Sequence, residues 1–323
     1  MMGAESPPIL HVLAPAKLNL YLEVGGRRPD GFHEIDSIFH EVTLYDRLEI
    51  EATSDGEIRL EEKGIAEAEQ NLVHRAARKL KESGLVRDPR KGARIRLEKT
   101  IPQGAGLGGG SSDAAATLRA LARLWDIPHD TRALHGIAAE LGSDVPFFLT
   151  GGTCRCRGRG EEVTSWNDAF SHEDPLHFVL VYPRFPVPTK LAYEALARSR
   201  EGEFALTPSS TLDSMPPTVA RTRFGSGQLF FNRFQGVVYP AFPELKGIHA
   251  RLSEEPFLKV LMSGSGSTIY GVCRDGGVAS GLARKLEATL AADVYAVRTA
   301  PRSSPDSPSP HMRSRGGFPG PEE

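Results

Sequence analysis

The feature that most constrains this chain is a glycine-rich stretch that passes without a gap into a helix-forming run. Five glycines occupy the seven positions from Gly104 to Gly110, and Ser111, Ser112 and Asp113 follow directly. Glycine adopts backbone angles that other residues resist and leaves no Cβ over the amides. Ser and Asp are preferred N-cap residues, and the first amides of a helix have no internal partner. The stretch therefore predicts an anion site, most often for phosphate, at a helix N-terminus.

A flexible linker is the alternative interpretation, since Gly and Ser dominate such segments. Two features favour the phosphate site. Leu107 interrupts the glycines with an apolar anchor, and both flanks are strongly patterned, unlike those of a linker.

The glycine pattern does not fit the commoner phosphate loops. Gly104 to Gly109 satisfies G-x-G-x-x-G, but a dinucleotide fold needs an acidic residue about 20 positions on, after a second strand. Asp126 has nearly that spacing, yet it ends the helix and is soon followed by Pro128. A Walker A loop closes on Gly-Lys-Ser/Thr, and a protein-kinase loop continues into a strand. We therefore expect a third type of phosphate loop.

Composition excludes several classes of protein. The length of 323 residues suggests two domains or one large one. Basic and acidic residues nearly balance, 39 against 41, so no basic excess points to a nucleic-acid partner. Cys154, Cys156 and Cys273 cannot all pair, which favours a reduced, cytoplasmic setting. We expect neither a signal peptide nor an apolar run that could cross a membrane.

Hydrophobic periodicity predicts a mixture of strands and helices. Strands are expected at residues 9–24 with a short loop at 14–17, at 38–45, 47–52, 93–99, 177–182, 258–262, 268–273 and 293–299, and as a pair over 153–163. Helices are expected from 70–72 to just before Gly84, and at 114–125, 130–141, 189–198, 237–252 and 278–291. Residues 201–227 are weakly patterned, and the tail from Pro301 onward, poor in apolar residues, should be disordered.

Five motifs, in the same order, resemble those of the GHMP kinase superfamily. Residues 102–115 match its ATP loop, residues 15–20 (Pro-Ala-Lys-Leu-Asn-Leu) its first motif, and residues 262–268 (Met-Ser-Gly-Ser-Gly-Ser-Thr) its third. The Gly-Gly-Gly-Ser-Ser-Asp form, with residues 27–33 (Arg-Arg-Pro-Asp-Gly-Phe-His) and 141–147 (Leu-Gly-Ser-Asp-Val-Pro-Phe), resembles one branch, the kinases of 4-diphosphocytidyl-2-C-methyl-D-erythritol.

The resemblance implies an α+β, two-domain GHMP kinase fold with the active site in the interdomain cleft. The N-terminal domain, expected over residues 1–160, would be ribosomal protein S5 domain 2-like and bind ATP. The C-terminal domain, over 161–300, would be ferredoxin-like, and 301–323 would be the disordered tail.

The resemblance also implies a catalytic pair, Asp144 and Lys17. From the sequence alone, Asp144 in a Gly-Ser-Asp-Val-Pro loop is equally a capping or turn aspartate, and Lys17 is an ordinary surface lysine. In the family the aspartate accepts the proton of the attacked hydroxyl. The lysine lies beside it, keeps it ionised and lowers the pKa of that hydroxyl.

ATP, with Mg²⁺, is expected at the glycine loop and beside the helix that follows Asn71. Asn71 is also a good N-cap, and the two roles can coexist. Ser111 and Ser112 are candidates for contacts with phosphate or Mg²⁺. The residues expected to bind ATP are Asn71, Pro102, Gln103, Gly104, Ala105, Gly106, Leu107, Gly108, Gly109, Gly110, Ser111 and Ser112.

The acceptor side is implied by residues far apart in the sequence. Phe32 and Tyr193 would stack on the two faces of a cytosine, and His33 would hydrogen-bond to it. From the sequence pattern alone, Tyr193 is predicted to be a helix core residue. Asn19 projects opposite to Leu18 and Leu20, toward a polar cleft or toward solvent. Thr189 would be a nearby polar contact, and the third motif, Gly264, Ser265 and Gly266, would close over the phosphates or form a simple strand turn.

Three positions depart from the family pattern. The family commonly has Tyr where this chain has Phe32, so stacking survives but a hydroxyl contact is lost. It often has Pro in place of Ser267, which affects loop rigidity. It has acidic residues within 231–235 that are missing here, so no role is assigned to that segment.

We therefore expect ATP-dependent phosphorylation of the 2-hydroxyl of 4-diphosphocytidyl-2-C-methyl-D-erythritol, giving the 2-phosphate and ADP. A mevalonate or homoserine kinase is the alternative within the superfamily, and the aromatic pair argues against both. A non-catalytic nucleotide-binding protein is the alternative from another class, and it needs neither Lys17 nor Asp144. The partners expected are a small cytidine diphosphate-linked substrate, no nucleic acid and no membrane, for a monomer or homodimer.

Overall fold

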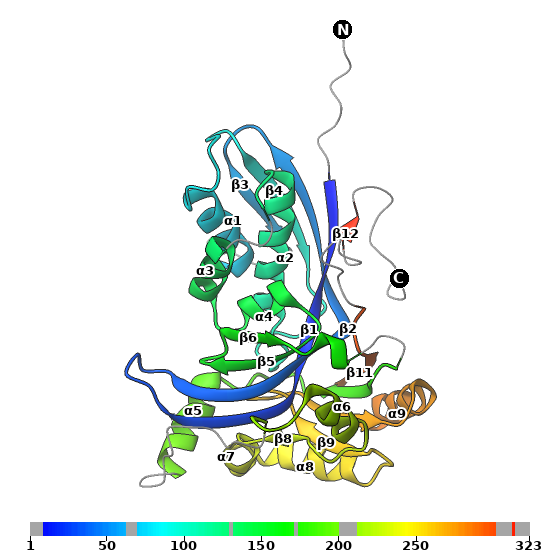
Figure 1. The fold of residues 1–323 in the computed structure, drawn as a ribbon. Helices are drawn as coiled ribbons and strands as arrows, with labels where there is room; N and C mark the ends of the chain where they lie inside the picture. The colour runs from blue at the N-terminus through cyan, green and yellow to red at the C-terminus, as the bar shows by residue number, and fades with distance from the viewer. Residues whose placement is uncertain are drawn as a thin grey trace.

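The computed structural model describes residues 9–62, 70–128, 132–170, 174–199, 212–301 and 312–313. The strands within these ranges form an eight-stranded and a four-stranded sheet (Figure 1). No helix in the same ranges is long and apolar enough to cross a bilayer.

The larger sheet is built on the long antiparallel pair of β1 and β2. Its path runs β12-β1-β2-β4-β3; β5 joins β2 and β6, and β8 lies parallel to β1. Its strands are β1 (Ile9–Arg27), β2 (His33–Thr53), β3 (Ile58–Glu62), β4 (Gly92–Glu98), β5 (Thr153–Gly158), β6 (Glu162–Ser165), β8 (Phe231–Asn232) and β12 (Met312–Arg313). Helices α1 (Leu72–Glu82), α2 (Gly109–Leu124), α3 (Arg132–Leu141) and α4 (Val145–Thr150) pack on it and on one another.

The smaller sheet is antiparallel throughout. Its strand order is β11 (Asp293–Arg298), β7 (His177–Tyr182), β10 (Ile269–Cys273) and β9 (Lys259–Met262). Helices α8 (Pro243–Ser253) and α9 (Gly276–Thr289) pack against it. The remaining helices are α5 (Thr189–Ser199), α6 (Pro217–Gly225) and α7 (Gln235–Ala241), with a 3₁₀ turn at Asn167–Ala169.

The helix after the glycine loop begins earlier than predicted. Gly108 is its N-cap, with a left-handed φ of 72° that favours glycine, and α2 starts at Gly109. Ser111, Ser112 and Asp113 therefore lie inside the helix rather than at its cap. The glycine conformation thus starts the helix, and the polar side chains that follow are available for other contacts.

Two predicted breaks in strands are absent. The prediction of a loop at 14–17 is wrong, because β1 continues through these residues with a register shift between Pro15 and Ala16. Such a bulge lets a proline, which lacks an N–H, stay within a sheet. The strands expected at 38–45 and 47–52 are both part of the single strand β2.

Helix boundaries also differ from expectation. The helix predicted over 237–252 is two helices, α7 and α8, that meet at Phe242, because Pro243 begins the second. α4 and α6 were not predicted; each has proline in its first turn, where the missing N–H costs nothing.

The larger sheet takes strands from both predicted domains. Residue 160 falls between β5 and β6, and β6, β8 and β12 all follow it in the sequence. The predicted tail disorder, 301–323, lies outside the described residues except at Pro301 and in β12, which pairs with β1. Cys154, Cys156 and Cys273 are buried and form no disulfide.

Candidate active site

A cavity of about 1140 Å³ is lined by residues of the larger sheet, the glycine loop, α5 and the loop between β9 and β10. Every predicted site residue lines it except Leu107, Ser112 and Gly266. Leu107 is instead buried in the core, which confirms the predicted apolar anchor, and its carbonyl accepts the amide of Lys17 at 2.9 Å. The cavity therefore collects residues from positions 17 to 265 of the sequence.

The glycine loop and the third glycine motif lie directly against each other. Ser263 Oγ donates to the carbonyl of Gly106 at 2.9 Å, and the amide of Thr268 donates to the carbonyl of Ala105 at 3.2 Å. Gly106 has a φ of 77°, and a Cβ placed on it would lie 2.1 Å from the carbonyl oxygen of Ser263. Glycine at 106 is thus required both by its conformation and by the closeness of the second loop.

The predicted catalytic pair is assembled in the cavity. Lys17 Nζ lies 3.5 Å from Asp144 Oδ2, although the two residues are far apart in the chain. Asp144 is the N-cap of α4, yet its side chain makes no capping hydrogen bond. The capping alternative therefore fails for its side chain, which meets Lys17 instead. At this position the carboxylate also lies near the positive end of a short helix.

Lys17 is held by more than Asp144. Its ammonium donates to Asn19 Oδ1 at 2.6 Å and lies 4.4 Å from the centre of the Phe39 ring. Asn19 Nδ2 donates in turn to Ser37 Oγ at 2.9 Å. Both Lys17 and Asn19 are almost completely buried. This network fixes the ammonium, and it explains why an amide is present at position 19.

Lys99 lines the cavity although no role for it was predicted from the sequence. Its ammonium donates to a carboxylate oxygen of Asp46 and, at 2.6 Å, to Asp113 Oδ2. Burial lowers the pKa of Lys99, but the two carboxylates outweigh burial and hold it above the usual value. Burial, reinforced by the charge of Asp46, raises the pKa of Asp113 well above its usual range despite Lys99.

A signal for Lys99 was present in the sequence. Residues 93, 95 and 97 of β4 are buried and residues 94 and 96 are exposed, so Lys99 continues the inward-facing phase. A lysine that faces inward needs acidic partners. The partners themselves could not be predicted, because Asp46 comes from β2 and Asp113 from α2.

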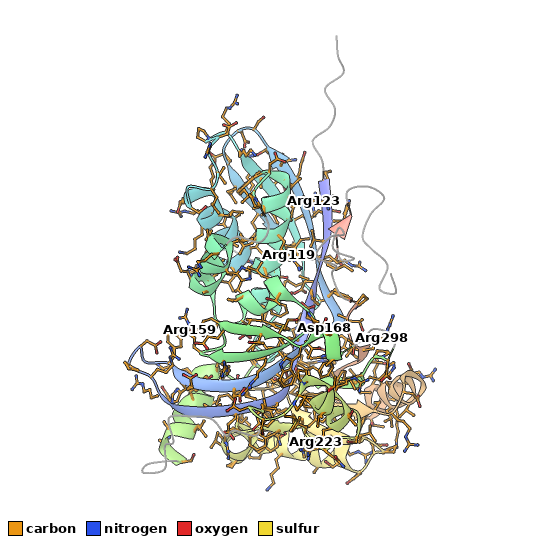
Figure 2. The ribbon with its side chains drawn as sticks, in the orientation of Figure 1. Arg119, Arg123, Arg159, Asp168, Arg223 and Arg298 are labelled. Carbon is orange, nitrogen blue, oxygen red and sulfur yellow. The ribbon has the colours of Figure 1, made fainter. Side chains whose placement is uncertain are left out.

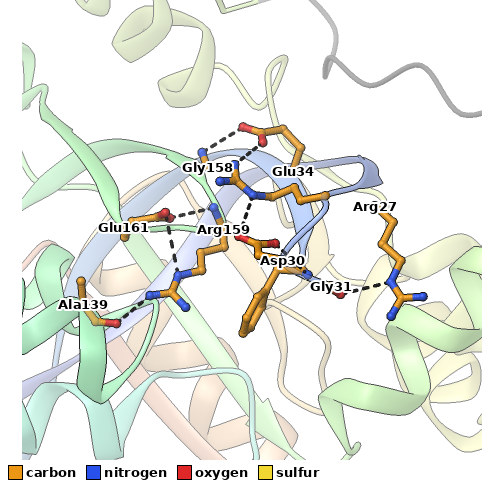
Figure 3. Close-up of polar contacts among 10 residues, drawn as sticks. Arg27, Asp30, Gly31, Glu34, Ala139, Gly158, Arg159 and Glu161 are labelled. Carbon is orange, nitrogen blue, oxygen red and sulfur yellow. Dashed lines mark hydrogen bonds and ion pairs between the residues drawn. The ribbon is translucent and has the colours of Figure 1, made fainter.

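The opposite end of the cavity is formed by the turn between β1 and β2. Phe32 lies there with 48% of its surface exposed, and its amide donates to Asp30 Oδ1 at 3.1 Å. The Arg159 guanidinium lies 5.0 Å from the centre of the Phe32 ring and donates to the carbonyl of Ala139 at 2.8 Å (Figure 3). Arg159 also lines the cavity, alone among the residues labelled in Figure 2. It was not predicted, since nothing in the sequence links it to the turn.

Tyr193 stacks on His33. The two ring centres are 4.9 Å apart with an interplanar angle of 21°, and Phe234 meets the edge of Tyr193 at 4.8 Å. Burial and the nearby charge of Arg27 lower the pKa of His33, which favours the neutral imidazole. The hairpin of β1 and β2 reaches α5 at this point (Figure 1), so the aromatic groups meet only in the folded chain.

The remaining predicted residues have defined places. Asn71 caps α1 by accepting the amide of Val73 at 2.8 Å, which confirms the capping alternative, and it also lines the cavity. Ser112 Oγ is buried beside the glycine loop without a hydrogen-bond partner among the described residues. Thr189 Oγ1 and Ser265 Oγ are 3.0 Å apart and join α5 to the third motif.

Comparison with known proteins gives consistent results. The models of the GHMP kinases N terminal domain and GHMP kinases C terminal match residues 71–152 and 220–292. The chain is 39% identical over 272 residues to the 4-diphosphocytidyl-2-C-methyl-D-erythritol kinase of Pelotomaculum thermopropionicum, covering 83% of this chain and 90% of the relative.

Solved structures agree with the sequence comparison. The crystal structure of a 4-(cytidine 5'-diphospho)-2C-methyl-D-erythritol kinase superposes with a TM-score of 0.74 at 37% identity, covering 90% of this chain and 100% of that one. A homoserine kinase from Cytophaga hutchinsonii has a TM-score of 0.68 at 18% identity, covering 93% and 96%, and so shares the fold.

Proposed function

The chain belongs to the GHMP kinase superfamily, and from that premise we propose that it phosphorylates the 2-hydroxyl of 4-diphosphocytidyl-2-C-methyl-D-erythritol with ATP. The products are the 2-phosphate and ADP, a step of the non-mevalonate route to isoprenoids. The observation that carries the catalytic assignment is the meeting of Lys17 and Asp144 in one cavity with the glycine loop. A protein that only binds a nucleotide has no need of this pair.

In the proposed mechanism, Asp144 is the general base. The oxygen of the 2-hydroxyl attacks the γ-phosphorus of ATP, and its proton passes to the Asp144 carboxylate. The bond between the γ-phosphorus and the bridging oxygen breaks, and ADP leaves with its electron pair. The ammonium of Lys17, held by Asn19, lowers the pKa of the hydroxyl and stabilises the negative charge that develops on it.

The glycine loop is the proposed phosphate site. Its glycines and the first residues of α2, Gly109 to Ser111, line the same cavity as Asp144. The amides of such a loop and of a first helical turn are the groups that bind phosphate. Ser112 Oγ is a hydroxyl oxygen without a hydrogen-bond partner in the described part of the chain, a group that fits Mg²⁺ or phosphate. Mg²⁺ bound to ATP would neutralise phosphate charge, and Ser111, which lines the cavity, is the residue proposed to contact it.

The aromatic end of the cavity is the proposed cytidine site. Phe32 offers an exposed ring for stacking, and His33 and Tyr193 form a second aromatic surface beside it. Neither mevalonate nor homoserine carries a base that would use these rings. We also propose a cytoplasmic location and a monomer or homodimer, as expected from the sequence.

An assay of ADP release tests this function. The purified protein is incubated with Mg²⁺, ATP and, in separate reactions, the cytidylated methylerythritol, mevalonate, homoserine or no acceptor. Turnover is expected with the first acceptor and only background with the others. Turnover on mevalonate or homoserine without turnover on the cytidylated substrate would refute the proposal.

A further inference from the structure

The segment 231–235, which has no role predicted from the sequence, lies between β1 and the third glycine motif. β8 pairs in parallel with β1, with Asn232 opposite Leu22, and the amide of Arg233 donates to the carbonyl of Leu22 at 2.9 Å. The Arg233 guanidinium binds both carboxylate oxygens of Glu23 at 2.6 Å. The segment is thus fixed to the strand that carries Lys17 and Asn19.

The other side of this segment holds the entry to the third glycine motif. Asn232 Nδ2 donates to the carbonyls of Met262 and Gly264, at 2.6 and 2.8 Å, and its Oδ1 accepts the amide of Phe234 at 2.9 Å. Gln235 Oε1 accepts the amide of Met262 at 2.9 Å. Both backbone polar groups of Met262 and the carbonyl of Gly264 are therefore bound by two side chains.

The position of this motif matters for the cavity. Gly264 and Ser265 line it, and a Cβ on Gly264 would lie 3.3 Å from the carbonyl oxygen of Gly106 and 3.4 Å from Asn19 Oδ1. A shift of the motif toward the glycine loop would therefore bring it against Gly106 or against Asn19, the partner of Lys17. Asn232 is almost completely buried. If its side-chain amide loses a carbonyl acceptor, water therefore cannot take that acceptor's place.

We propose that Asn232 and Gln235 are positioning residues that set the third glycine motif against the glycine loop and Asn19. The inference rests on the proposed kinase function. The two side-chain amides make opposite kinds of hydrogen bond. Asn232 must donate hydrogen bonds to two carbonyls, while Gln235 needs only to accept one from a backbone amide. An acidic residue is therefore unnecessary at 235, because the amide oxygen of Gln235 makes the same hydrogen bond as a carboxylate oxygen.

Two substitutions that leave the size of the side chain unchanged distinguish the donor role from the acceptor role. Asn232→Asp replaces the donor by an oxygen that faces two carbonyls, whereas Gln235→Glu keeps the acceptor. We expect Asn232→Asp to lower kcat by about 10²-fold, the effect of a displacement of roughly 1 Å at an active site. Gln235→Glu should stay within about threefold of the wild type, and Gln235→Leu, which has no acceptor, should lose roughly tenfold, the effect of one lost hydrogen bond.

Further measurements separate positioning from stability. Arg233→Met removes the ion pair with Glu23 in the same segment and should lower Tm without lowering kcat at 25 °C. Affinity for a non-hydrolysable ATP analogue with Mg²⁺ is measured in parallel, because it needs no acceptor and is independent of the substrate assignment. Asn232→Ala, which adds no charge, is the second variant if Asn232→Asp does not fold.

The outcomes are distinct. Loss of kcat and of analogue affinity in the Asn232 variant, with both retained in Gln235→Glu and Arg233→Met, supports the proposal. Equal activity of Asn232→Asp and Gln235→Glu would overturn it, as would losses that follow Tm equally in the Asn232 and Arg233 variants. Failure of the wild type on the cytidylated substrate would instead refute the proposed function, with analogue affinity still testing the positioning.

Discussion

The two ends of the active-site cavity are built in different ways. The phosphate end consists of two glycine loops whose backbones contact each other, with the amide of Thr268 bound to the carbonyl of Ala105. Lys99 lies there between two buried carboxylates. The aromatic end consists of Phe32, half exposed on a turn, beside His33 and Tyr193. One end is backbone against backbone, and the other is side chain against side chain.

This difference assigns phosphoryl transfer to the phosphate end and selection of the acceptor substrate to the aromatic end. A backbone–backbone contact such as that at Gly106 tolerates no side chain, so the phosphate end cannot vary without disturbing the fold. The aromatic end can change its side chains while the strands and α5 stay in place. We therefore expect substitutions at the phosphate end to affect turnover or stability, and those at the aromatic end to affect KM for the acceptor.

The largest effect is expected where the two ends meet, at Asp144. Asp144→Asn keeps the size of the side chain but removes the base, so kcat should fall by about 10²–10⁴-fold. Affinity for ATP should change little. Steady-state kinetics and analogue binding measure both, with Asp126→Asn as a control, because Asp126 is 92% exposed. Near-normal kcat would remove Asp144 from the role of base.

The next largest effect is expected for Lys99 at the phosphate end. Lys99→Met leaves Asp46 and Asp113 buried without their cation, so the free energy of unfolding should fall by about 3–5 kcal/mol. Lys79→Met, which breaks an exposed pair with Glu140, should cost no more than about 1 kcal/mol. Urea unfolding compares them. Equal losses would show that the buried cluster does not stabilise the phosphate end.

At the aromatic end, Phe32 is expected to act on KM alone. Phe32→Ala removes the exposed ring and should raise KM for the cytidylated substrate about tenfold, within the range of one base stacked on an aromatic side chain. Phe32→Tyr, the residue common in the family, should remain near the wild type. KM for ATP should be unchanged in both. A fall in kcat with no change in the acceptor KM would contradict the separation of the two ends.

The smallest effect is expected for Arg159, which covers the Phe32 ring. Arg159→Met removes a cation–π contact and a hydrogen bond to α3, so the acceptor KM should rise about two- to fivefold. Arg157→Met is the matched control, since Arg157 lies two residues earlier, at the end of β5, is exposed and does not line the cavity. If both variants behave alike, Arg159 does not position the turn.

The sequence predicted most of the phosphate end because that end is local. The alternating strand before Lys99, the glycines and the following helix are contiguous, and the structure confirms their order. The sequence predicts too late a start for this helix, because Ser111 to Asp113 have side chains that commonly cap a helix. Gly108 supplies the left-handed backbone that starts α2 earlier, and Asp113 binds Lys99 instead of capping amides.

The aromatic end could be predicted only as a set of residues. The resemblance named Phe32, His33 and Tyr193, but not that Tyr193 stacks on His33 or that Arg159 covers Phe32. Those contacts depend on where α5 and β5 meet the hairpin of β1 and β2. Periodicity reports which face of an element is buried, and it carries no information about which distant element covers that face.

The sequence by itself determined the loop chemistry, the order of motifs and the family, because these depend on residue type and on neighbours in the chain. Only the tertiary structure decided that Asn19 holds Lys17, that Asp46 and Asp113 share Lys99, and that Asn232 binds the third motif. The physical reason is that a buried charge or amide must find a partner, while the fold alone brings a suitable one within hydrogen-bond distance.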